Sequence, residues 1–345
     1  MSELIGGSGT RTGSQNTILS RRQSSILIDM FKSSPRKFAP AYANAICYSG
    51  YREGQSPPSG VFPTYEQIRE DLLILARHWR YLRIYDCTPH AEIVLRVIRN
   101  ERLPLQVMLG LGLGAEISNH NCPWGGVYSD ETLATNRAAN DAELGRMIAL
   151  SNAYPREVLA LSIGNEASVD WNDHMVPVER LIEMAKVLRD KTSHPVTFCE
   201  NYVPWTNKLK PLVDYLDLIS IHTYPVWEYK SLDEALAYTQ ENYYAVKGRY
   251  PTMPVVITEA GWTTRSNGRG IETWNASEEL QAAYYQRLIE WVTEEQILTF
   301  VFEAFDEPWK GSPDPSEPEK HWGLFTLERQ PKKVMNELFG DLTQA

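Results

Sequence analysis

The chain has 345 residues, of which 43% are apolar and 23% are charged, and this composition excludes a disordered, collagen-like or coiled-coil protein. Its formal net charge of −10 argues against binding to nucleic acid or to an anionic membrane surface. The sequence contains no apolar stretch as long as the roughly 18–20 residues of a membrane span, and residues 1–15 lack the apolar core of a secretory signal. We therefore expect a folded cytoplasmic protein, with no nucleic-acid, membrane or protein partner implied.

Residues 1–40 differ in composition from the rest of the chain. They contain six basic and two acidic residues, and they are rich in Ser, Gly and Thr. This composition is typical of a transit peptide or of a mobile tail, and we favour a basic, Ser-rich tail with a short helix around residues 25–31. We assign residues 41–345 to a single folded domain.

The four cysteines are spread through the chain. They form no CxxC pair, and no His lies at ligand spacing from them. We therefore predict reduced thiols, without a disulfide framework, a structural metal site or another cofactor.

Short apolar runs alternate with helical patterns from residue 41 onward. The runs, which we predict to be strands, cover residues 41–48, 81–87, 105–113, 157–165, 195–201, 215–224, 254–262 and 297–305. The stretches with a 3.6-residue apolar period, which we predict to be helices, include residues 65–78, 91–100, 133–153, 178–191, 232–249 and 277–293. Continuous apolar strands that are separated by helices are typical of a parallel sheet buried on both faces.

Eight such units fit the α/β class and a single (β/α)8 barrel, also called a TIM barrel. Ile46 in the first run and Phe302 in the last are 256 residues apart, which agrees with the typical length of about 250 residues for this fold. An open doubly wound sheet is the alternative. Neither a GxGxxG fingerprint nor a P-loop opens the first helix, so we predict the barrel.

The active sites of such barrels lie at the carboxyl ends of the strands. Most of the predicted strands end in aromatic or polar side chains, namely Tyr48, Tyr85, Asp86, Asn165, Glu166, Glu200, Asn201, His222, Tyr224, Glu259, Trp262, Glu303, Asp306, Glu307 and Trp309. We therefore expect these side chains to meet at one rim of the barrel.

Glu166 and Glu259 differ from the other rim residues because each follows a strongly apolar run. A carboxylate that emerges from a buried strand is desolvated, so it takes up a proton unless a partner restores its charge. For any one carboxylate, a structural ion pair is the simpler explanation. These two lie 93 residues apart, which is three units, so we expect them to face each other across the barrel mouth. One protonated and one ionised carboxyl group are the minimum that glycoside hydrolysis needs.

Tryptophan is common in the predicted rim loops. Seven of the ten tryptophans follow strand runs or lie in these loops, namely Trp124, Trp171, Trp205, Trp227, Trp262, Trp309 and Trp322. Flat apolar rings are suited to stacking on sugars, so we expect some of them to bind sugar units. Packing at the top of the barrel is the alternative role, and we weigh it in particular for Trp262.

Several motifs together resemble glycoside hydrolase family 17 in its microbial form. They are SIGNEA at 162–167, IHTYP at 221–225, ITEAGW at 257–262, FEAFDEPWK at 302–310 and HWGLF at 321–325. YSGYREGQSP at 48–57 and LRIYDC at 82–87 extend the resemblance, which covers about residues 42–340. That family comprises retaining β-1,3-glucanases and β-1,3-glucanosyltransferases on a (β/α)8 barrel. The resemblance therefore implies an enzyme that acts on a β-glucan polysaccharide or oligosaccharide.

The resemblance also implies roles for individual residues. It makes Glu166 the acid/base and Glu259 the nucleophile, and it places Asn165 at the substrate 2-hydroxyl and Tyr224 beside the nucleophile. Glu307, Lys310 and Glu319 match a polar group that supports the nucleophile side. Together with the rim positions, the expected substrate-binding residues are Tyr48, Tyr85, Asn165, Glu200, His222, Tyr224, Trp262, Glu303, Glu307, Trp309, Lys310 and Glu319.

Alternatives to a β-1,3-glucan hydrolase remain. A glucanosyltransferase uses the same glycosyl-enzyme intermediate and differs only in whether water or a sugar hydroxyl attacks it. A metal-dependent barrel enzyme on a small sugar is the rival from another class, since Glu200, His222, Glu259 and Glu303 are suitable ligands. That set lacks an HxH pair or an Asp cluster, and the Trp-rich rim fits a sugar polymer better. A catalytically inactive sugar-binding module is disfavoured because both glutamates are present.

Overall fold

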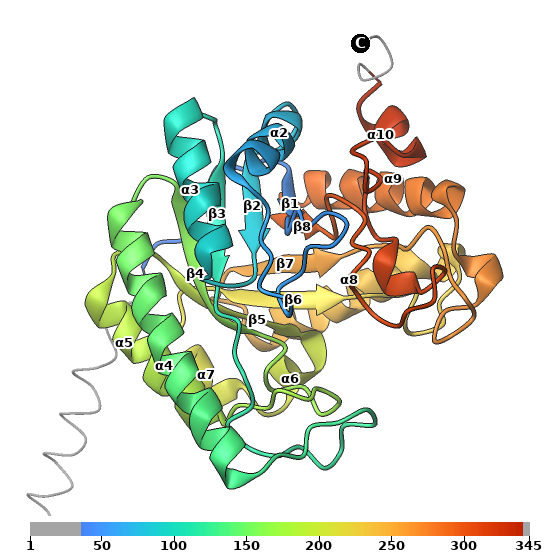
Figure 1. Ribbon diagram of the computed structural model, residues 1–345. Coiled ribbons are helices and arrows are strands. Elements are labelled where there is room, and N and C mark those ends of the chain that lie inside the picture. The colour runs from blue at the N-terminus through green and yellow to red at the C-terminus, as the bar shows by residue number, and fades with distance from the viewer. Residues whose placement is uncertain (1–35, 341–345) are drawn as a thin grey trace, which may run out of the picture. The chain divides into compact units, whose positions relative to one another are not determined.

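The computed structural model describes residues 36–340, and Figure 1 shows its strands surrounded by helices. All eight strands are parallel and pair in chain order, and β8 pairs with β1, so the sheet closes into a barrel. The prediction of a (β/α)8 TIM barrel is confirmed. The helix expected around residues 25–31 lies outside the described residues, and residues 36–44 form neither helix nor strand.

Every strand falls within one of the predicted apolar runs. The strands are β1 (Ala45–Cys47), β2 (Tyr81–Ile84), β3 (Gln106–Gly110), β4 (Val158–Asn165), β5 (Val196–Asn201), β6 (Ile219–Thr223), β7 (Val255–Ala260) and β8 (Thr299–Val301). The larger helices are α2 (Tyr65–Leu75), α3 (Pro89–Glu101), α4 (Asp130–Ala153), α5 (Val178–Lys191), α8 (Leu232–Arg249) and α9 (Glu278–Glu294). Shorter helices are α6 (Tyr202–Thr206), α7 (Lys210–Val213), α10 (Lys333–Leu338), η1 (Thr273–Asn275) and η2 (Pro318–Lys320).

The apolar runs are longer than the strands they contain. Run 41–48 contributes only the three residues of β1, and run 297–305 contributes only the three of β8. Tyr48 and Phe305 nevertheless remain almost fully buried. Side chains just beyond the last ladder hydrogen bond still pack into the core, so burial extends further along the chain than strand pairing does.

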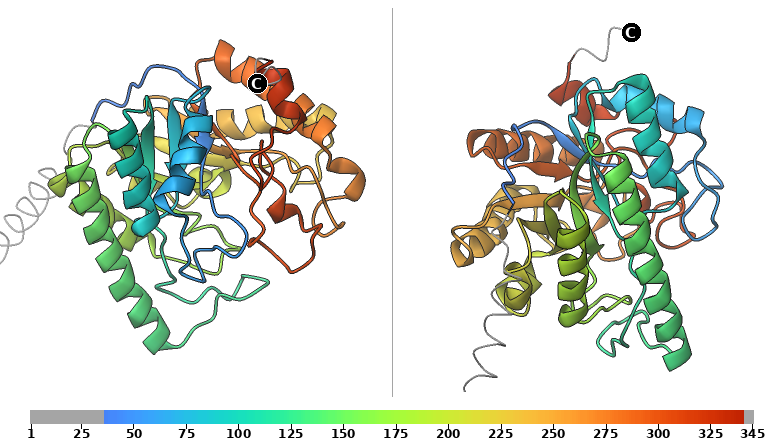
Figure 2. Two further views of the ribbon diagram at one scale, coloured as in Figure 1. Left: turned by 45° about the horizontal axis from the view of Figure 1, so that its top comes forward. Right: turned by 90° about the vertical axis from the view of Figure 1, so that its left-hand side faces the viewer.

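The connection between β3 and α4 is long and leads into the longest helix of the described residues. Figure 2 shows α4 running past the ends of the strands, with this connection at its N-terminal end. The connection carries Trp124, whose side chain is 64% exposed. Within residues 36–340, none of the helices is both long enough and apolar enough to cross a membrane.

A buried ion-pair cluster joins the first βα unit to the end of the barrel domain. Asp71 in α2 is fully buried, and its two oxygens accept hydrogen bonds from the Nε and Nη2 atoms of Arg329, at 2.8 Å each. Arg52 donates to the same carboxylate at 2.9 Å, and the Tyr48 hydroxyl donates to it at 3.1 Å. Arg329 itself is only 7% exposed, whereas the side chain of Arg52 is 23% exposed, so the Asp71–Arg329 pair forms the buried part of the cluster.

We expect Asp71→Asn to lower the free energy of unfolding by about 3–5 kcal/mol, because it leaves the buried guanidinium of Arg329 without a countercharge. Glu70→Gln is the matched control on the same helix. Its carboxylate also binds Arg52, at 2.8 Å, but the side chain is 58% exposed, so a loss below about 1 kcal/mol is expected. Urea-induced unfolding measures both variants, and equal losses would contradict a structural role for the cluster.

Candidate active site

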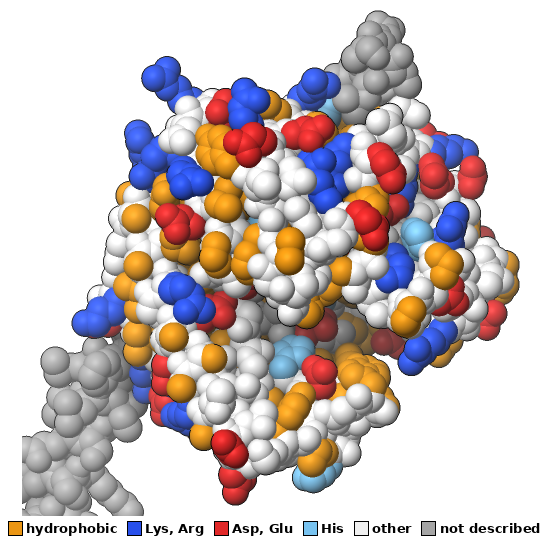
Figure 3. All heavy atoms as spheres, in the orientation of Figure 1, with side chains coloured by type: hydrophobic (Ala, Val, Ile, Leu, Met, Phe, Trp, Pro, Cys, Tyr) orange, Lys and Arg blue, Asp and Glu red, His pale blue; other side chains and the backbone are white. Residues whose placement is uncertain are grey.

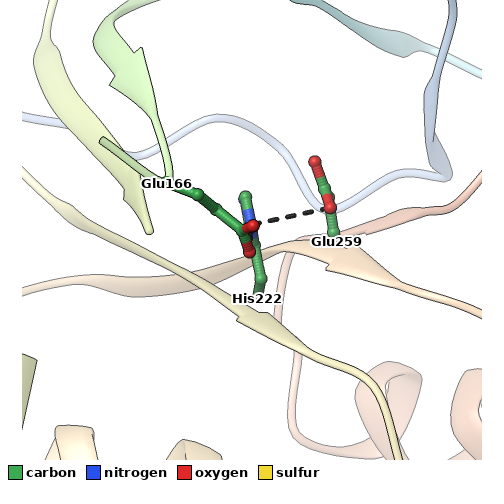
Figure 4. Close-up of side chains that lie close together, drawn as sticks. All are labelled: Glu166, His222 and Glu259. Carbon is green, nitrogen blue, oxygen red and sulfur yellow. Dashed lines mark hydrogen bonds and ion pairs between the residues drawn. The ribbon is translucent and has the colours of Figure 1, made fainter. Parts of the chain in front are cut away.

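Glu166, His222 and Glu259 converge at the carboxyl ends of three strands, as Figure 4 shows. Glu166 follows β4 directly, His222 lies in β6, and Glu259 lies in β7. One nitrogen of the imidazole and one oxygen of each carboxylate lie within 4.8 Å of one another. The expectation that the two glutamates face each other at one end of the barrel therefore agrees with their positions.

Irregular strand register brings these three side chains together. The ladders between β4 and β5, between β6 and β7, and between β7 and β8 each shift register close to Asn165, His222 or Glu259. Such irregularities change the direction in which a side chain points. Glu166 also has a φ of +47°, an uncommon left-handed conformation for a residue other than glycine, and its backbone N–H donates to the Cys199 carbonyl at 2.9 Å.

Both glutamates line a cavity of about 1140 Å³. Its aromatic walls are formed by Trp124, Trp171, Tyr202, Tyr224, Trp227, Tyr238, Phe302 and Trp322. Its polar side chains include Asp173, Asn201, Glu228, Arg269, Ser312, Glu317 and Glu319. The space-filling view in Figure 3 shows a hollowed face on which acidic and hydrophobic side chains gather. An elongated ligand with flat apolar faces and many hydroxyl groups fits this lining.

Glu259 is held as a carboxylate by several donors. The Arg83 guanidinium and the Tyr85 hydroxyl, the latter at 3.0 Å, donate to its Oε1 atom. The Tyr224 hydroxyl donates to Oε2 at 2.5 Å. Burial by itself favours the protonated form of Glu259, but the charges of His222 and Arg83 and the Tyr224 hydrogen bond outweigh it and lower the pKa to about 2. Glu259 is therefore ionised at neutral pH.

His222 is the cation between the two carboxylates. Its Nδ1 atom lies 2.9 Å from Glu166 Oε1 and 3.5 Å from Glu259 Oε2. Burial disfavours the charged imidazolium, but the Glu259 charge, together with hydrogen bonds that include the one to Glu166, raises its pKa to about 10. The imidazolium can thus donate a hydrogen bond to Glu166 while it stabilises the charge of Glu259.

A second polar cluster follows β8. Lys310 forms ion pairs with Glu303 at 2.9 Å and with Glu307 at 2.5 Å. Burial and the Glu307 charge raise the pKa of Glu303 well above its usual range, although Lys310 opposes that shift. Burial, opposed by Lys310 and assisted by the charge of Glu259, raises the pKa of Glu319, a cavity residue, to about 7.

Nine of the twelve expected substrate-binding residues divide into three groups. Tyr224 and Glu319 line the cavity, together with the two glutamates. Three further residues contact the catalytic group without lining the cavity. Tyr85 donates to Glu259, Asn165 accepts from the Arg83 guanidinium that binds Glu259, and His222 contacts Glu166. Glu303, Glu307, Trp309 and Lys310 form one connected group, in which Trp309 Nε1 donates to Glu307 at 3.2 Å.

Three expected binding residues lie inside the protein instead of at the cavity. Tyr48 is fully buried beside Asp71, and Glu200 is fully buried and accepts hydrogen bonds from the Ser168 hydroxyl at 2.7 Å and the Ser168 N–H at 2.8 Å. Trp262 is also fully buried, and its Nε1 atom donates to the Asn275 carbonyl at 2.9 Å. A ring without exposed surface cannot stack on a sugar, so the expectation for Trp262 was wrong and the alternative of packing holds.

Arg83 is the functional residue that the sequence reasoning missed. It lies in β2, is only 2% exposed, and donates to both Glu259 and the Asn165 side chain. The available signal was a charged residue in the middle of the apolar run YLRI, because a buried charge needs a partner. The partner could not be read from the sequence, since Glu259 is far away along the chain.

The donor set fits an ion-pair network better than a metal site. Among the described residues, the group that could share an ion is Glu166, His222 and Glu259, whereas Glu200 and Glu303 have other partners. Both oxygens of Glu259 already accept hydrogen bonds. The set predicted for a metal-dependent enzyme therefore does not come together.

Comparison with known proteins identifies the domain. The sequence pattern of the BtgE/BtgC glycoside hydrolase domain matches residues 45–323. An endo-laminarinase from Formosa Hel1_33_131 is 25% identical, with 87% of each chain covered and a TM-score of 0.75. A glycoside hydrolase family 17 β-1,3-glucanosyltransferase from Rhizomucor miehei shares the fold at 21% identity, with 85% of this chain and 96% of that chain covered and a TM-score of 0.64.

One curated relative matches over a shorter stretch. A glucan 1,3-beta-glucosidase from Arthroderma benhamiae is 34% identical over 82 residues, which are 23% of this chain. The match spans 26% of the length of that protein, so most of the relative has no counterpart in the alignment.

The charge of His222 leads us to predict how the free energy of unfolding depends on pH. Because its pKa is raised in the folded protein, the stabilisation it provides is complete below the unfolded value of about 6.5 and is lost as the pH rises toward about 10. We expect the difference in unfolding free energy between the wild type and His222→Gln to decrease over this range. Denaturant unfolding at several pH values measures it, and nitrogen NMR of the imidazole reports its protonation directly. An imidazole that titrates near pH 6.5 would contradict the assignment.

Proposed function

The chain belongs to the BtgE/BtgC glycoside hydrolase domain family, and on this premise we propose that it is a retaining hydrolase of β-1,3-glucosidic bonds in glucans, of the family 17 type. The observation that carries the proposal is the pairing of Glu166 with Glu259. One oxygen of Glu166 lies within 4.8 Å of one oxygen of Glu259 at one end of the barrel. Retaining pairs stand about 5–5.5 Å apart, whereas inverting pairs leave roughly 6.5–9.5 Å for a water molecule.

The environments of the two carboxylates support different roles. Glu259 is buried, ionised and fixed by Arg83 and Tyr224, as a nucleophile requires. Glu166 is more exposed, with 28% of its side chain accessible, and lines the cavity where a leaving group must be reached. His222 contacts both side chains and keeps them at a fixed separation.

The proposed reaction has two displacements. In the first, Glu259 forms a bond to the anomeric carbon while the glycosidic bond breaks, and Glu166 gives its proton to the departing oxygen. In the second, Glu166 removes a proton from water, the water oxygen attacks the anomeric carbon, and the bond to Glu259 breaks. Two inversions restore the β configuration. Asn165, which Arg83 holds in place, is the proposed contact of the 2-hydroxyl.

The proposed substrate class rests on the cavity and on the relatives. The cavity offers several aromatic faces, which suit a chain of glucose rings. The endo-laminarinase and the glucan 1,3-beta-glucosidase found above have names that point to the same linkage. We therefore favour a hydrolase that cleaves within a β-1,3-glucan chain or at its end.

Transfer to a sugar acceptor is the second candidate, and the position of two tryptophans favours it. Trp171 lies on the connection that also carries Glu166, and Trp124 lies on the preceding connection of the barrel. Both line the cavity, with exposures of 38% and 64%. Because the acid protonates the leaving group, leaving and accepting sugars bind on the Glu166 side. Two exposed rings there can hold an acceptor in place of water.

Azide rescue tests the assigned roles. Glu166→Ala should reduce kcat/KM on a natural glucan about 100- to 10,000-fold, because the leaving oxygen receives no proton. The dinitrophenolate leaving group needs no proton from an acid, so Glu166→Ala should still form the glycosyl-enzyme intermediate from a dinitrophenyl glucoside. Azide should then release the glucosyl group as the β-glucosyl azide. Glu259→Ala with azide should give the α-glucosyl azide, since azide enters from the vacated face.

Glu228→Gln is the matched control, because it removes another cavity carboxylate and should change kcat/KM only a few-fold. An α-glucosyl azide from Glu166→Ala together with a β-glucosyl azide from Glu259→Ala would contradict the two-carboxylate mechanism. An unchanged rate for Glu166→Ala on the natural substrate would contradict it as well.

The ratio of transfer to hydrolysis tests the second candidate. Trp171→Ala should lower this ratio about 2- to 10-fold at a fixed concentration of laminari-oligosaccharide, as expected for the loss of one aromatic contact with the acceptor. Trp227→Ala, which removes a lining ring on the connection after β6, should raise KM with little change in the ratio. Chromatography of the products measures both. A wild type that forms only hydrolysis products at high acceptor concentration would rule out transfer.

A further inference from the structure

Two aromatic side chains outside the cavity are more exposed than any other large hydrophobic residue of the described chain. Tyr229 is 73% exposed and Trp274 is 68% exposed. Neither belongs to the cavity lining or to the catalytic group. Tyr229 follows β6, and Trp274 lies in η1 after β7, so both stand on the connections that follow neighbouring strands.

The two connections are fastened to each other. Asn275, next to Trp274, donates from its side-chain amide to the carbonyl of Lys230, next to Tyr229, at 2.9 Å. Asn275 is 4% exposed, so water does not compete freely for this bond. The Lys230 ammonium lies 5.5 Å from the centre of the Tyr238 ring, a ring that lines the cavity. The exposed pair therefore stands on turns that are attached to the cavity wall.

Each turn is held in a defined conformation. The carbonyl of Asn275 accepts a hydrogen bond from buried Trp262, whose ring packs 5.3 Å from that of Tyr284. The turn of Tyr229 is closed by hydrogen bonds from the Glu228 and Lys230 N–H groups to the Pro225 carbonyl, at 3.1 and 3.0 Å. Tyr229 has a φ of +57°, an uncommon conformation for this residue. Rings on fixed turns lose little further entropy when a ligand binds.

The exposed pair is continuous with the cavity. Trp227 and Glu228, immediately before Tyr229, both line it. Gly270, shortly before η1, also lines it and packs against Trp227, since a Cβ at Gly270 would lie only 2.6 Å from that ring. The turns of Tyr229 and Trp274 therefore adjoin the part of the cavity lining that Trp227 forms.

We propose that Tyr229 and Trp274 form an outer binding surface for a β-glucan strand that extends beyond the catalytic cavity next to Trp227; this inference rests on the function proposed above. A neutral polysaccharide fits the chemistry, because each ring can stack on the apolar face of one sugar unit. Two rings with polar neighbours are too small a surface for a stable protein interface, which needs about 1,000 Å². The surface would increase affinity for long chains without taking part in bond cleavage.

The test compares long and short substrates in the full chain. Trp274→Ala and Tyr229→Ala should each weaken binding to a long β-1,3-glucan about 2- to 10-fold, and the double variant should weaken it further. All three should keep kcat/KM on laminaritriose within about 2-fold of the wild type. Trp274→Tyr, which retains a ring, should keep most of the binding. Tyr244→Ala is the matched control, because it removes a 46% exposed ring on α8 that packs against Trp291.

Three outcomes would overturn the inference. The first is a double variant that binds the long glucan as the wild type does while both cleave laminaritriose. The second is a self-association of the wild type that the double variant loses in sedimentation velocity, which would assign the surface to a contact between two copies. The third is a wild type that neither binds nor cleaves any β-1,3-glucan, and this result, unlike the first two, removes the proposed function itself.

Discussion

The charge network around Glu259 is the constraint on which the rest of the site depends. A carboxylate with 6% exposure is unstable in its ionised form unless partners replace the water it has lost. Arg83 and Tyr85 provide that replacement from the end of β2, and His222 and Tyr224 provide it from the end of β6. Because one charge attracts side chains from across the barrel, its position determines where the others must lie. Both carboxyl groups line the cavity, and Glu166 is the more exposed of the two, with 28% of its side chain accessible.

The barrel makes this convergence possible through its irregular strand pairs. Parallel strands of a closed sheet direct their carboxyl ends toward one opening, but regular register alone would distribute the side chains evenly around it. The shifts near Asn165, His222 and Glu259 and the left-handed backbone of Glu166 turn these groups toward one another. Three register shifts therefore lie close to these residues, whereas the shift between β3 and β4 lies near the amino ends of those two strands. The ion-pair cluster around Asp71 stabilises the domain at a separate place, so the two buried charge networks serve different purposes.

Some of the tryptophans pack inside the protein, and others line the cavity or face solvent. Trp205 and Trp262 are fully buried and donate their indole N–H groups to backbone carbonyls, whereas Trp124, Trp171 and Trp227 line the cavity. Trp262 has an indirect role, because it holds the turn from which Trp274 reaches solvent. The buried ring of Trp262 thus supports the turn that carries the exposed ring of Trp274, and the sequence alone does not distinguish these two positions.

The sequence by itself determined the eight strands, the large helices and the barrel, because apolar runs and helical periods are local properties that tertiary packing did not override here. It also singled out Glu166 and Glu259, since each ends a strongly apolar run, and the motifs around them resemble known glycosidases. Only the tertiary structure decided the rest. It paired Arg83 with Glu259, placed the His222 imidazolium between the two carboxylates, and buried Tyr48, Glu200 and Trp262. The strand register decides which side chains at a strand end point to the cavity. Contacts between segments far apart in the chain decide which charge each of them meets, and no local sequence pattern specifies such contacts.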